Sequence, residues 1–432
     1  MHKIERLLQT LAPKGVGFRK LGEVLEYDQP NQYCVTSKEF DKSYPTPVLT
    51  AGKTFILGYT NEKDNIYQAS KNAPVIIFDD FTTATQWVDF PFKVKSSAMK
   101  ILLPKNPTIN IRFIFFYMQT IPYNISGEHT RQWISRYSQL EVPIPPLEIQ
   151  QEIVKILDAF TELNTELNTE LNVRKKQYQY YQNMLLDFND INQSRKDAKE
   201  RLAQKPYPKR LKTLLHTLAP KGVGFRKLGE IGEYIRGVTY KKNQEINNLE
   251  CGIKVLRANN ITLSNHLNFE DIKVINKNVK IREEQYLKKN DILICAGSGS
   301  SEHIGKVAFI NTDFDYVFGG FMGVIRIREI NSRFVYHIFT SNIFKQYLEK
   351  SLNTTTINNL NANILQNFLI PIPPLEIQQE IVKILDQFSI LTTDLLAGIP
   401  AEIKARKKQY EYYREKLLTF KPLTPHKEVK KC

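Results

Sequence analysis

The chain has 432 residues, of which 42% are apolar and 11% aromatic, enough for two or more globular domains with cores of their own. Its net charge of +15 favours a polyanionic partner such as nucleic acid, although a basic balance can also serve solubility alone. The cysteines form no CxxC pair, the N-terminus lacks the apolar core of a signal peptide, and no apolar run approaches the ~20 residues that span a bilayer. We therefore expect a cytoplasmic protein without disulfides, zinc or membrane contact.

Two segments of the chain occur twice, in the order A-B-A′-B′. The sequence LLQTLAPKGVGFRKLGEVLEY at residues 7–27 returns at 214–234 with three substitutions, and PIPPLEIQQEIVKILD at 143–158 returns unchanged at 371–386. Repeats this far apart indicate duplicated domains, because solenoid units recur every ~20–50 residues. Each A segment predicts a short amphipathic helix, a glycine-bounded turn, and then a strand or the start of a helix.

The two inserts between the repeated segments, residues 28–141 and 235–369, share no recognisable sequence similarity. Short apolar or alternating runs bounded by Asn, Asp, Gly and Pro predict strands, at 54–57, 74–78 and 90–94 in the first insert and at 253–256, 291–295 and 321–327 in the second. A helix is predicted after the strands of each insert, over 109–120 and 333–350. Because the elements follow in the same order, we expect one α+β fold that carries two different surfaces.

The B segments predict an extended strap followed by a long helix. Three prolines at 143–146 forbid a helix there, and apolar residues recur at helical spacing directly after them. In the first copy the helix continues through TELNTELNTELN at 161–172, whose leucines lie four residues apart and so share one broad face. In the second copy Gly398 and Pro400 predict a break, with a new helix that starts near Pro400. Both helices end in matched tails, RKKQYQYYQNMLLDF at 174–188 and RKKQYEYYREKLLTF at 406–420.

Motifs for catalysis, cofactors and metals are missing from the sequence. Residues 51–54 (AGKT) resemble the end of a phosphate-binding loop, but Pro47 stands where that loop needs a glycine. Residues 297–301 (GSGSS) follow a predicted strand, yet the third glycine of a dinucleotide-binding turn is absent, so a tight turn is the simpler interpretation. The histidines form no metal-spaced pair and there is no Asn-Pro-Pro-aromatic motif of amino-methyltransferases. We predict no catalytic residue, metal or cofactor.

Basic and polar clusters in the inserts are candidates for DNA binding, although each cluster alone is also compatible with an ordinary solvated surface. Lys93 and Lys95 alternate along a predicted strand and would share one face, while arginine and asparagine are the side chains that read guanine and adenine. The small residues of the 297–301 turn would let a backbone approach phosphate. The predicted DNA-binding residues are Lys53, Lys93, Lys95, Lys100, Tyr240, Lys241, Lys242, Arg257, Asn259, Asn260, Ser298 and Lys306.

The order of insert, strap and long helix, found twice with PIPPLEIQQEIVKILD and the RKKQY tails, resembles the specificity (S) subunit of type I restriction-modification systems along essentially the whole chain. The resemblance implies a non-catalytic subunit with two target recognition domains, each of which reads one half of a split double-stranded DNA sequence. It also implies that the conserved segments hold these domains apart and dock two modification (methyltransferase) subunits and, through them, restriction subunits.

We therefore predict two α+β target recognition domains separated by a pair of long antiparallel helices, with internal pseudo-two-fold symmetry. That symmetry is the simplest relation between tandem copies, and it offers the same docking surface twice. The predicted order is 1–146 first recognition domain, 147–188 first helical region, 189–213 linker, 214–374 second recognition domain, 375–420 second helical region and 421–432 disordered tail. The predicted docking residues are Pro145, Pro146, Gln150, Pro373, Pro374, Gln378, Tyr180 and Tyr412.

Two other classes of protein fit parts of these observations. A standalone nuclease or methyltransferase would act on DNA without partners, but the missing motifs disfavour it. A standalone DNA-binding protein or a helical scaffold would share the repeats without a role in restriction. DNA affinity that falls steeply with salt would separate a DNA-binding subunit from a scaffold, because phosphate contacts release counterions.

Overall fold

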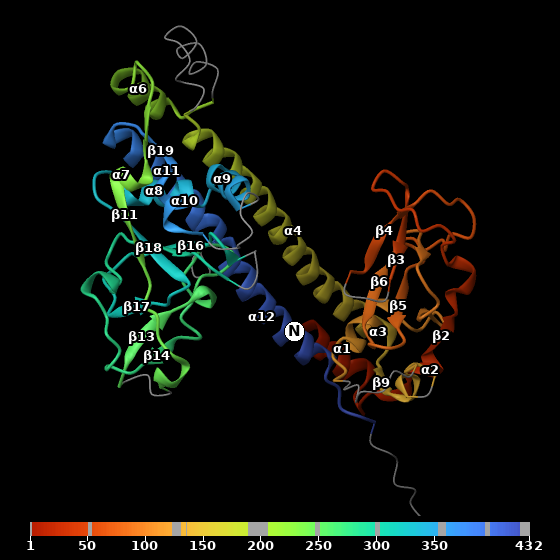
Figure 1. The fold of residues 1–432 in the computed structure, drawn as a ribbon. Coiled ribbons are helices and arrows are strands. Elements are labelled where there is room, and N and C mark those ends of the chain that lie inside the picture. The colour runs from red at the N-terminus through yellow and green to blue at the C-terminus, as the bar shows by residue number, and fades with distance from the viewer. Residues whose placement is uncertain are drawn as a thin grey trace, which may run out of the picture. The chain divides into compact units, whose positions relative to one another are not determined.

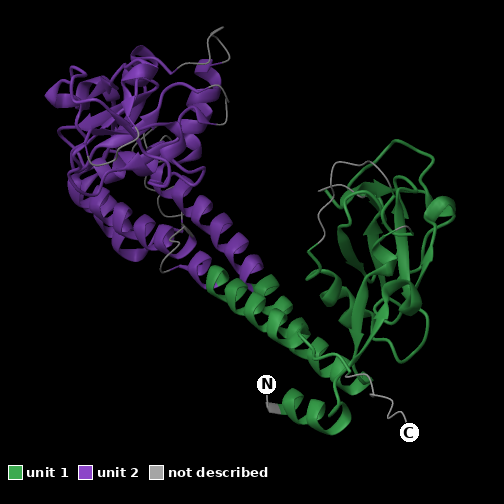
Figure 2. Ribbon diagram, turned by 90° about the horizontal axis from the view of Figure 1, so that it is seen from below, with its two compact units in different colours: residues 1–166, 403–432 green, residues 167–402 purple. Residues whose placement is uncertain are grey.

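The computed structural model describes residues 2–50, 54–122, 131–134, 136–188, 206–246, 251–298, 303–352, 360–393 and 398–423. The chain forms two compact units, one of residues 1–166 with 403–432 and the other of residues 167–402 (Figure 2). Each unit therefore combines one insert with helical segments from both copies of the repeat. None of the helices in the described ranges is long and apolar enough to cross a membrane.

The first unit is an α+β domain (Figure 1). Its elements are α1 (His2–Leu11), β1 (Gly17–Lys20), α2 (Leu21–Val24), β2 (Leu25–Asp28), β3 (Thr46–Leu49), β4 (Ile56–Thr60), β5 (Val75–Asp79), β6 (Thr85–Val88), β7 (Lys93–Val94), β8 (Met99–Pro104), α3 (Ile111–Met118), β9 (Glu141–Ile144), the first part of α4 (Leu147–Leu186) and most of α12 (Ile399–Leu418). The strands form sheets of order β2-β8-β5-β6, β4-β3-β7 and β1-β9. Strand β5 lies inside its sheet with all five residues buried, as its unbroken apolar run predicts.

The second unit repeats this plan. Its elements are the rest of α4, then α6 (Lys209–Leu218), β10 (Gly224–Lys227), α7 (Leu228–Ile231), β11 (Gly232–Arg236), β12 (Glu245–Ile246), β13 (Ile253–Leu256), β14 (Lys273–Ile275), β15 (Ile292–Cys295), β16 (Val307–Phe309), β17 (Tyr316–Phe318), β18 (Met322–Ile327), α8 (Ser332–Phe339), α9 (Asn342–Leu352), α10 (Ala362–Gln366), β19 (Leu369–Ile372) and α11 (Leu375–Thr393). Its sheets run β11-β18-β15-β16, β12-β14-β13-β17 and β10-β19.

The two inserts have one topology despite their unrelated sequences. Strands β2, β8, β5 and β6 of the first unit correspond to β11, β18, β15 and β16 of the second, and all neighbours in these sheets are antiparallel. The parallel pair β3 and β7 corresponds to β13 and β17. The prediction of one α+β fold for both inserts is confirmed.

The predicted helix over 333–350 is wrong in one respect, since α8 and α9 divide it. The break falls at Ser341, whose hydroxyl donates to the carbonyl of Ile338 at 2.7 Å and accepts from the amide of Ile343 at 3.2 Å. A serine that satisfies the free backbone groups at a helix start favours a new helix over continuation of the old one. The strand predicted at residues 54–57 lies slightly later in the chain, at Ile56–Thr60.

The strap segments are extended, as their prolines predict. Strand β9 pairs with β1 in the register Gly17↔Ile144 and Phe18↔Pro143, and β19 pairs with β10 in the register Gly224↔Ile372 and Phe225↔Pro371. The two ladders are equivalent residue for residue. Each forms a base from which the following long helix starts.

The long helices pair across the two halves of the sequence. Helix α4 is continuous for 40 residues, whereas α12 begins at Ile399, so the predicted break beside Pro400 is confirmed. In the first unit Phe160 of α4 stacks on Tyr413 of α12, with ring centroids 5.4 Å apart. In the second unit Tyr181 of α4 stacks on Phe388 of α11 at 5.1 Å. Later residues of α4 thus meet earlier residues of the C-terminal half, which makes the pair antiparallel.

The predicted linker and tail contain ordered residues. Within the predicted linker, residues 209–213 belong to α6, while 189–205 lie outside the described residues. The predicted tail starts too early, because the amide of Val16 donates to the carbonyl of Lys421 at 2.9 Å and the amide of Leu423 donates back to Val16 at 3.1 Å. Gly15 makes this pairing possible, since its φ is +107° and a Cβ there would lie 2.6 Å from the carbonyl oxygen of Pro422.

Candidate nucleic-acid interface

A buried glutamine joins each insert to its strap and helix. Gln150 donates to the carbonyl of Pro145 at 2.7 Å and accepts from the amide of Asn110 at 2.8 Å. In the second unit Gln378 makes the same two bonds, to Pro373 at 2.7 Å and from Asn331 at 2.9 Å. Both glutamines are buried, and their side chains form hydrogen bonds within their own unit. We therefore correct the prediction that Gln150 and Gln378 dock a partner.

Each junction also carries a matched ion pair. Arg112 at the start of α3 contacts Asp158 of α4 at 2.8 Å, and Arg333 at the start of α8 contacts Asp386 of α11 at 2.9 Å. Asparagine caps place both arginines, because the side chains of Asn110 and Asn331 accept the first free amides of these helices. The inserts are therefore anchored to the helix pair by the same contacts twice.

The second junction contains a buried histidine that the first lacks. His337 Nε2 lies 2.8 Å from Asp386 Oδ1, while Tyr178 on α4 and Tyr336 on α8 are close enough to interact with the same charges. Burial lowers the pKa of His337 although the hydrogen bond to Asp386 acts in the other direction. Burial alone would raise the pKa of Asp386, but His337 and Arg333 together lower it. This group therefore holds Asp386 as a carboxylate in the junction.

We predict that Gln378→Ala and Gln150→Ala each destabilise the unit in which they lie by about 2–4 kcal/mol, because backbone groups would remain buried without partners. In a unit of this size the loss lowers the melting temperature by roughly 5–10 °C. Calorimetry of each variant measures it. The control is Gln151→Ala, which changes the exposed neighbour of Gln150 in the same helix. Equal melting temperatures of Gln150→Ala and Gln151→Ala would show that the bonds to Gln150 add nothing.

Three chain segments of the second unit converge on the turn of residues 319–321, between β17 and β18. The amide of Val238 donates to Phe318 at 2.7 Å, and the amide of Gly319 donates to Leu256 at 2.9 Å. The amides of Ala296 and Gly297 both donate to the carbonyl of Phe321, at 2.9 and 3.0 Å. We name residues 319–321 the aromatic turn. It joins β17 of one four-stranded sheet to β18 of the other, and both strands are labelled in Figure 1.

Residues that the sequence predicts to bind DNA follow each of the three segments that bond to the aromatic turn. Tyr240, Lys241 and Lys242 follow the first converging segment, Arg257 and Asn259 follow the second, and Ser298 follows the third. Lys241, Lys242 and Asn259 are exposed. Arg257 is held by Asp271 at 2.7 Å, and its Cγ would lie 3.8 Å from a Cβ on Gly319. These six residues lie within four positions, along the chain, of the backbone groups that bond at the turn.

Two predicted residues of this unit lie in the interior instead. The ammonium of Lys306 donates to the carbonyls of Ala258 and Ile261, at 3.1 and 2.5 Å, and burial lowers its pKa. Asn260 is buried and donates to the carbonyls of Asn268 and Asp271. Both side chains position the loop that carries Arg257 and Asn259, and we remove them from the set of groups available to DNA.

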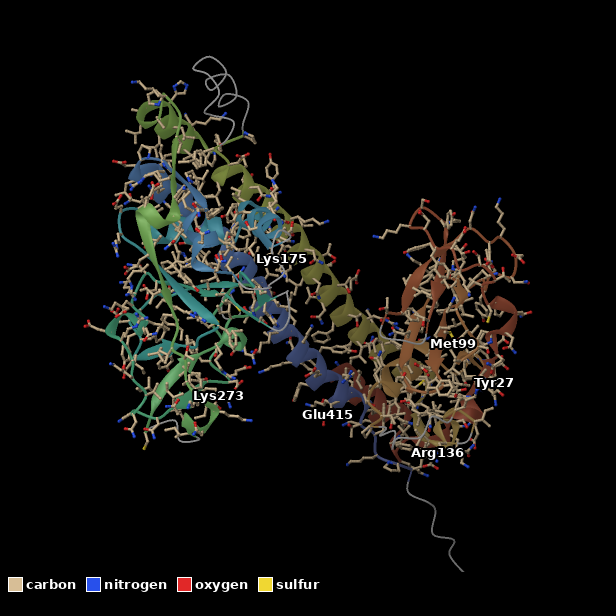
Figure 3. All side chains as sticks on the ribbon, viewed as in Figure 1. Tyr27, Met99, Arg136, Lys175, Lys273 and Glu415 are labelled. Carbon is tan, nitrogen blue, oxygen red and sulfur yellow. The ribbon has the colours of Figure 1, made fainter. Side chains whose placement is uncertain are left out.

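The first unit has the same convergence around residues 95–98. The amide of Val35 donates to Val94 at 2.9 Å, the amide of Lys95 to Leu49 at 2.8 Å, and the amide of Asp80 to Ala98 at 3.3 Å. These bonds match three of the four around the aromatic turn, those of Val238, Gly319 and Ala296. Met99, labelled in Figure 3, is the first residue of β8 after this turn, as Met322 is the first residue of β18.

The predicted lysines of the first unit separate into exposed and buried groups. Lys95 is exposed, whereas Lys93 is buried. The predicted strand that would place both on one face ends at Val94, before it reaches Lys95. Lys93 contacts Glu62 at 2.8 Å. Burial alone would raise the pKa of Glu62, but hydrogen bonds from Lys93, Ser37 and Thr36 lower it to about 2. Lys100 is also buried, where it donates to Gln29 and lies over the ring of Tyr27. Lys53 lies outside the described residues.

Phe321 is a residue that the sequence analysis missed as a site residue. Its side chain is 73% exposed, yet it stands between the largely buried strands β17 and β18. The strand predicted over 321–327 includes Phe321 as an ordinary strand residue. The signal that could have singled it out is Gly319 and Gly320 directly before it, since paired glycines mark a turn.

The tails carry the exposed members of the predicted docking set. Tyr180 and Tyr412 occupy equivalent positions in the two tails and are 57% and 58% exposed. Each lies edge-on to the next tyrosine, at 5.6 Å in the first tail and 5.3 Å in the second. Pro145 and Pro373 are buried and Pro146 and Pro374 half-buried, so the prolines shape the straps and offer little surface.

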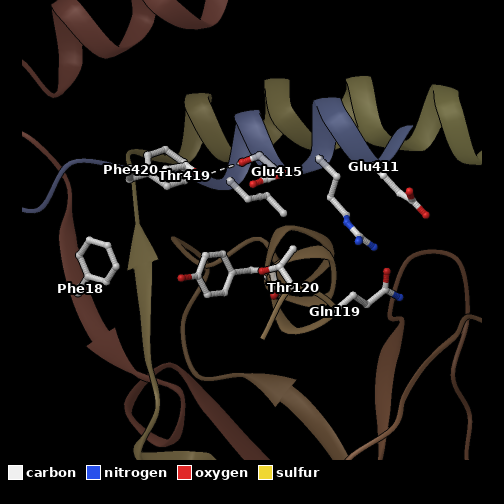
Figure 4. Close-up of a pocket in the computed structure, with 10 residues that line it drawn as sticks. Phe18, Gln119, Thr120, Glu411, Glu415, Thr419 and Phe420 are labelled. Atoms are coloured by element: carbon white, nitrogen blue, oxygen red, sulfur yellow. Dashed lines mark hydrogen bonds between the residues drawn. The ribbon is translucent and has the colours of Figure 1, made fainter. Parts of the chain in front are cut away.

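A cavity of about 570 Å³ lies in the first unit between α12 and the end of α3 (Figure 4). It is lined by aromatic rings, including Phe18 and Phe420, and by the charged groups of Glu411, Arg414 and Glu415. In the second unit Gln182, which corresponds to Arg414, donates to Thr340 Oγ1 at 2.9 Å and to the carbonyl of His337 at 3.1 Å. No group of His, Cys, Asp or Glu side chains in the described part of the chain could hold a metal ion.

Comparison with known proteins agrees with this arrangement. Residues 13–174 and 220–405 match the family described as "Type I restriction modification DNA specificity domain". The Escherichia coli "Type I restriction enzyme EcoR124I/EcoR124II specificity subunit" is 38% identical over 98% of both chains. A putative type I restriction enzyme specificity subunit of Haemophilus influenzae is 32% identical over 72% of this chain and 73% of its own.

A solved structure shares the fold. The crystal structure of a type I restriction-modification S subunit from M. genitalium aligns with a TM-score of 0.59 and 12% identity, covering 94% of this chain and 96% of that one. The chain belongs to the family of type I restriction-modification specificity subunits, which are non-catalytic.

Proposed function

We propose that each insert reads one half of a bipartite double-stranded DNA target, through the aromatic turn in the second unit and through residues 95–98 in the first. The observation that carries this proposal is that the same three backbone segments converge on both turns, while the side chains differ. The second turn carries Gly319, Gly320 and Phe321, and the first carries Lys95, Ser96, Ser97 and Ala98. A common framework with different side chains is what two different half-sites require, because base contacts specify and phosphate contacts position.

The charges near these turns fit a nucleic acid. Lys95 in the first unit and Lys241 and Lys242 in the second are exposed, and Arg and Asn side chains beside them carry the donors that pair with base edges. Sequencing the DNA methylated in cells that contain this chain and its modification subunit tests the proposal. A motif of two different half-sites separated by unread base pairs is expected. A single continuous motif would contradict it.

The repeated helices support a second part of the proposal, the docking of two identical modification subunits and, through them, restriction subunits. The tails present Tyr180 and Tyr412 with nearly equal exposure, one in each unit. An interface centred on an aromatic side chain needs it exposed in the free subunit and buried in the complex. Two equal surfaces predict two equal partners.

We predict that native mass spectrometry will show saturation at two modification subunits per chain. Tyr180→Ala and Tyr412→Ala should each weaken one site by about 30-fold or more, because truncation of a central interface aromatic costs roughly 2 kcal/mol or more. The matched control is Phe269→Ala, which removes another exposed ring, from the second insert. Saturation at a single modification subunit in the unaltered chain would rule out two docking sites.

A further inference from the structure

We propose that Phe321 is a specificity-determining residue, whose ring contacts the 5-methyl group of a thymine in the major groove of the half-site read by the second insert. The inference rests on the proposed function, since it assigns a contact within that DNA interface. Its starting point is the exposure of the ring, which at 73% is the highest among the large apolar residues in the described part of the chain.

The backbone of Phe321 is fixed although its side chain is exposed. Its carbonyl accepts from the amides of both Ala296 and Gly297, and the amide of the next residue, Met322, donates to Gly319 at 2.7 Å. Met322 itself is buried in the sheet. The ring therefore projects from a braced turn and needs no ordering of the backbone when it binds, which favours a specific contact.

The two residues before Phe321 have no side chains. A Cβ on Gly319 would meet Val255 Cγ1 at 3.7 Å, which is an ordinary contact, whereas a Cβ on Gly320 would lie only 3.1 Å from Thr239 Oγ1. The missing side chains leave bare backbone next to Phe321. Small residues at such a position allow the close approach that reading a base edge demands.

The width of the surface points to the major groove. Residues 237 and 296 border the aromatic turn and follow β11 and β15, which flank β18 in one sheet, where neighbouring strands lie about 4.8 Å apart. These two segments therefore lie roughly 10 Å apart, which exceeds the ~6 Å minor groove but fits the ~12 Å major groove. In that groove a phenylalanine ring has one specific partner, the thymine methyl group, which the other bases lack.

The charged neighbours fit this placement. Lys241 and Lys242, which follow the first segment bonded to the turn, are exposed and can contact phosphates, and Arg257, which borders Gly319, carries a guanidinium suited to guanine. The other residues of the turn are glycines, so the ring of Phe321 is the one apolar side chain that the turn offers to a methyl group on the DNA.

The experiment uses the complex of the full chain with its modification subunits and a duplex that contains the target found by sequencing methylated DNA. Each thymine of the second half-site is replaced in turn by deoxyuridine, which lacks only the methyl group. We expect one replacement to weaken binding by the unaltered complex about 3- to 10-fold. The Phe321→Ala complex should bind that duplex and the thymine duplex equally, and Phe321→Leu should keep part of the difference.

Leu263→Ala is the matched control, because Leu263 is 69% exposed in a loop whose Asn265 bonds to Val307 and Tyr336, away from the aromatic turn. It should leave the discrimination unchanged. A second half-site without thymine, or a Phe321→Ala complex that still discriminates at every thymine, would overturn the assignment. The proposed function would survive either result as long as exchange of residues 235–369 still changes this half-site.

Discussion

Exchange of residues 28–141 for the matching insert of another specificity subunit is expected to change one half of the methylated target completely and to leave the other half as it was. The residues at the borders of the insert belong to the repeated framework. Gly17 and Phe18 pair with the strap in the same register as Gly224 and Phe225, and the retained Gln150 and Asp158 offer an insert the same partners as Gln378 and Asp386. A foreign insert with the same fold should therefore meet the same junction.

The physical basis of this expectation is that sequence is read by base contacts, which lie on the insert, while the docking surfaces lie on the helix tails. The measurement is sequencing of methylated DNA in cells that supply the modification subunit. The reciprocal exchange of residues 235–369 is the matched control and should change only the other half. If either exchange altered both half-sites together, the inserts would not act as separate readers.

Removal of residues 165–168, one TELN unit, is expected to shorten the unread spacer between the half-sites by one base pair. Helix α4 is continuous through the repeated run, with Leu167 buried and the hydroxyls of Thr161 and Thr165 bonded back to the previous turn. Loss of four residues shortens an α-helix by about 6 Å and, because four residues turn about 400°, rotates the remainder of the helix by a net ~40°.

Rotation and translation give different answers for the spacer. One base pair advances about 3.4 Å and rotates roughly 34–36°. The rotation of the helix thus matches one base pair, whereas its shortening matches nearly two. We give rotation priority because a surface out of phase misses its groove, while a few ångströms along the axis can be absorbed by side chains or slight DNA bending.

Sequencing of methylated sites in cells that carry the deletion measures the spacer. The matched control is insertion of one more TELN unit after Asn172, which should lengthen the spacer by one base pair. Residues 389–405, the matching segment of the second copy, contain no such repeat. The helices that pair with α4 therefore have to tolerate its altered length. An active complex with unchanged spacing, or with altered half-sites, would show that the run is only exposed helix.

Local signals in the sequence were enough to predict the repeats, the straps, the continuous first helix, the break before the last helix and the shared order of elements in the two inserts. Prolines fix φ at the straps, helical spacing of Ile153 and Leu157 marks a buried face, and Gly398 with Pro400 ends one helix and starts another. Such signals act between neighbours in the chain and can be read without the rest of the fold.

Which polar side chains face solvent became clear only from the folded chain. Lys93, Lys100 and Lys306 look like surface lysines in the sequence, but their long stems let buried ammonium groups reach Glu62, Gln29 and two carbonyl groups. Gln150 and Gln378 turn inward because they satisfy backbone groups at a junction formed by residues distant in the chain. Burial of a polar group depends on partners that folding brings to it, which a local pattern does not contain.

The same reason explains why Phe321 was found only in the fold. In sequence it opens an apolar run that reads as a strand, and its neighbours Met322 and Val324 are indeed buried. Its exposure results from the bonds that residues 238, 256 and 296–297 make to the aromatic turn and the residue before it. These bonds fix the start of β18 at the residue after Phe321. In the fold, the first tail (174–188) belongs to the second unit and the second tail (406–420) belongs to the first. This exchange is also a long-range result, because the two strap segments are identical and contain no signal that would select one tail over the other.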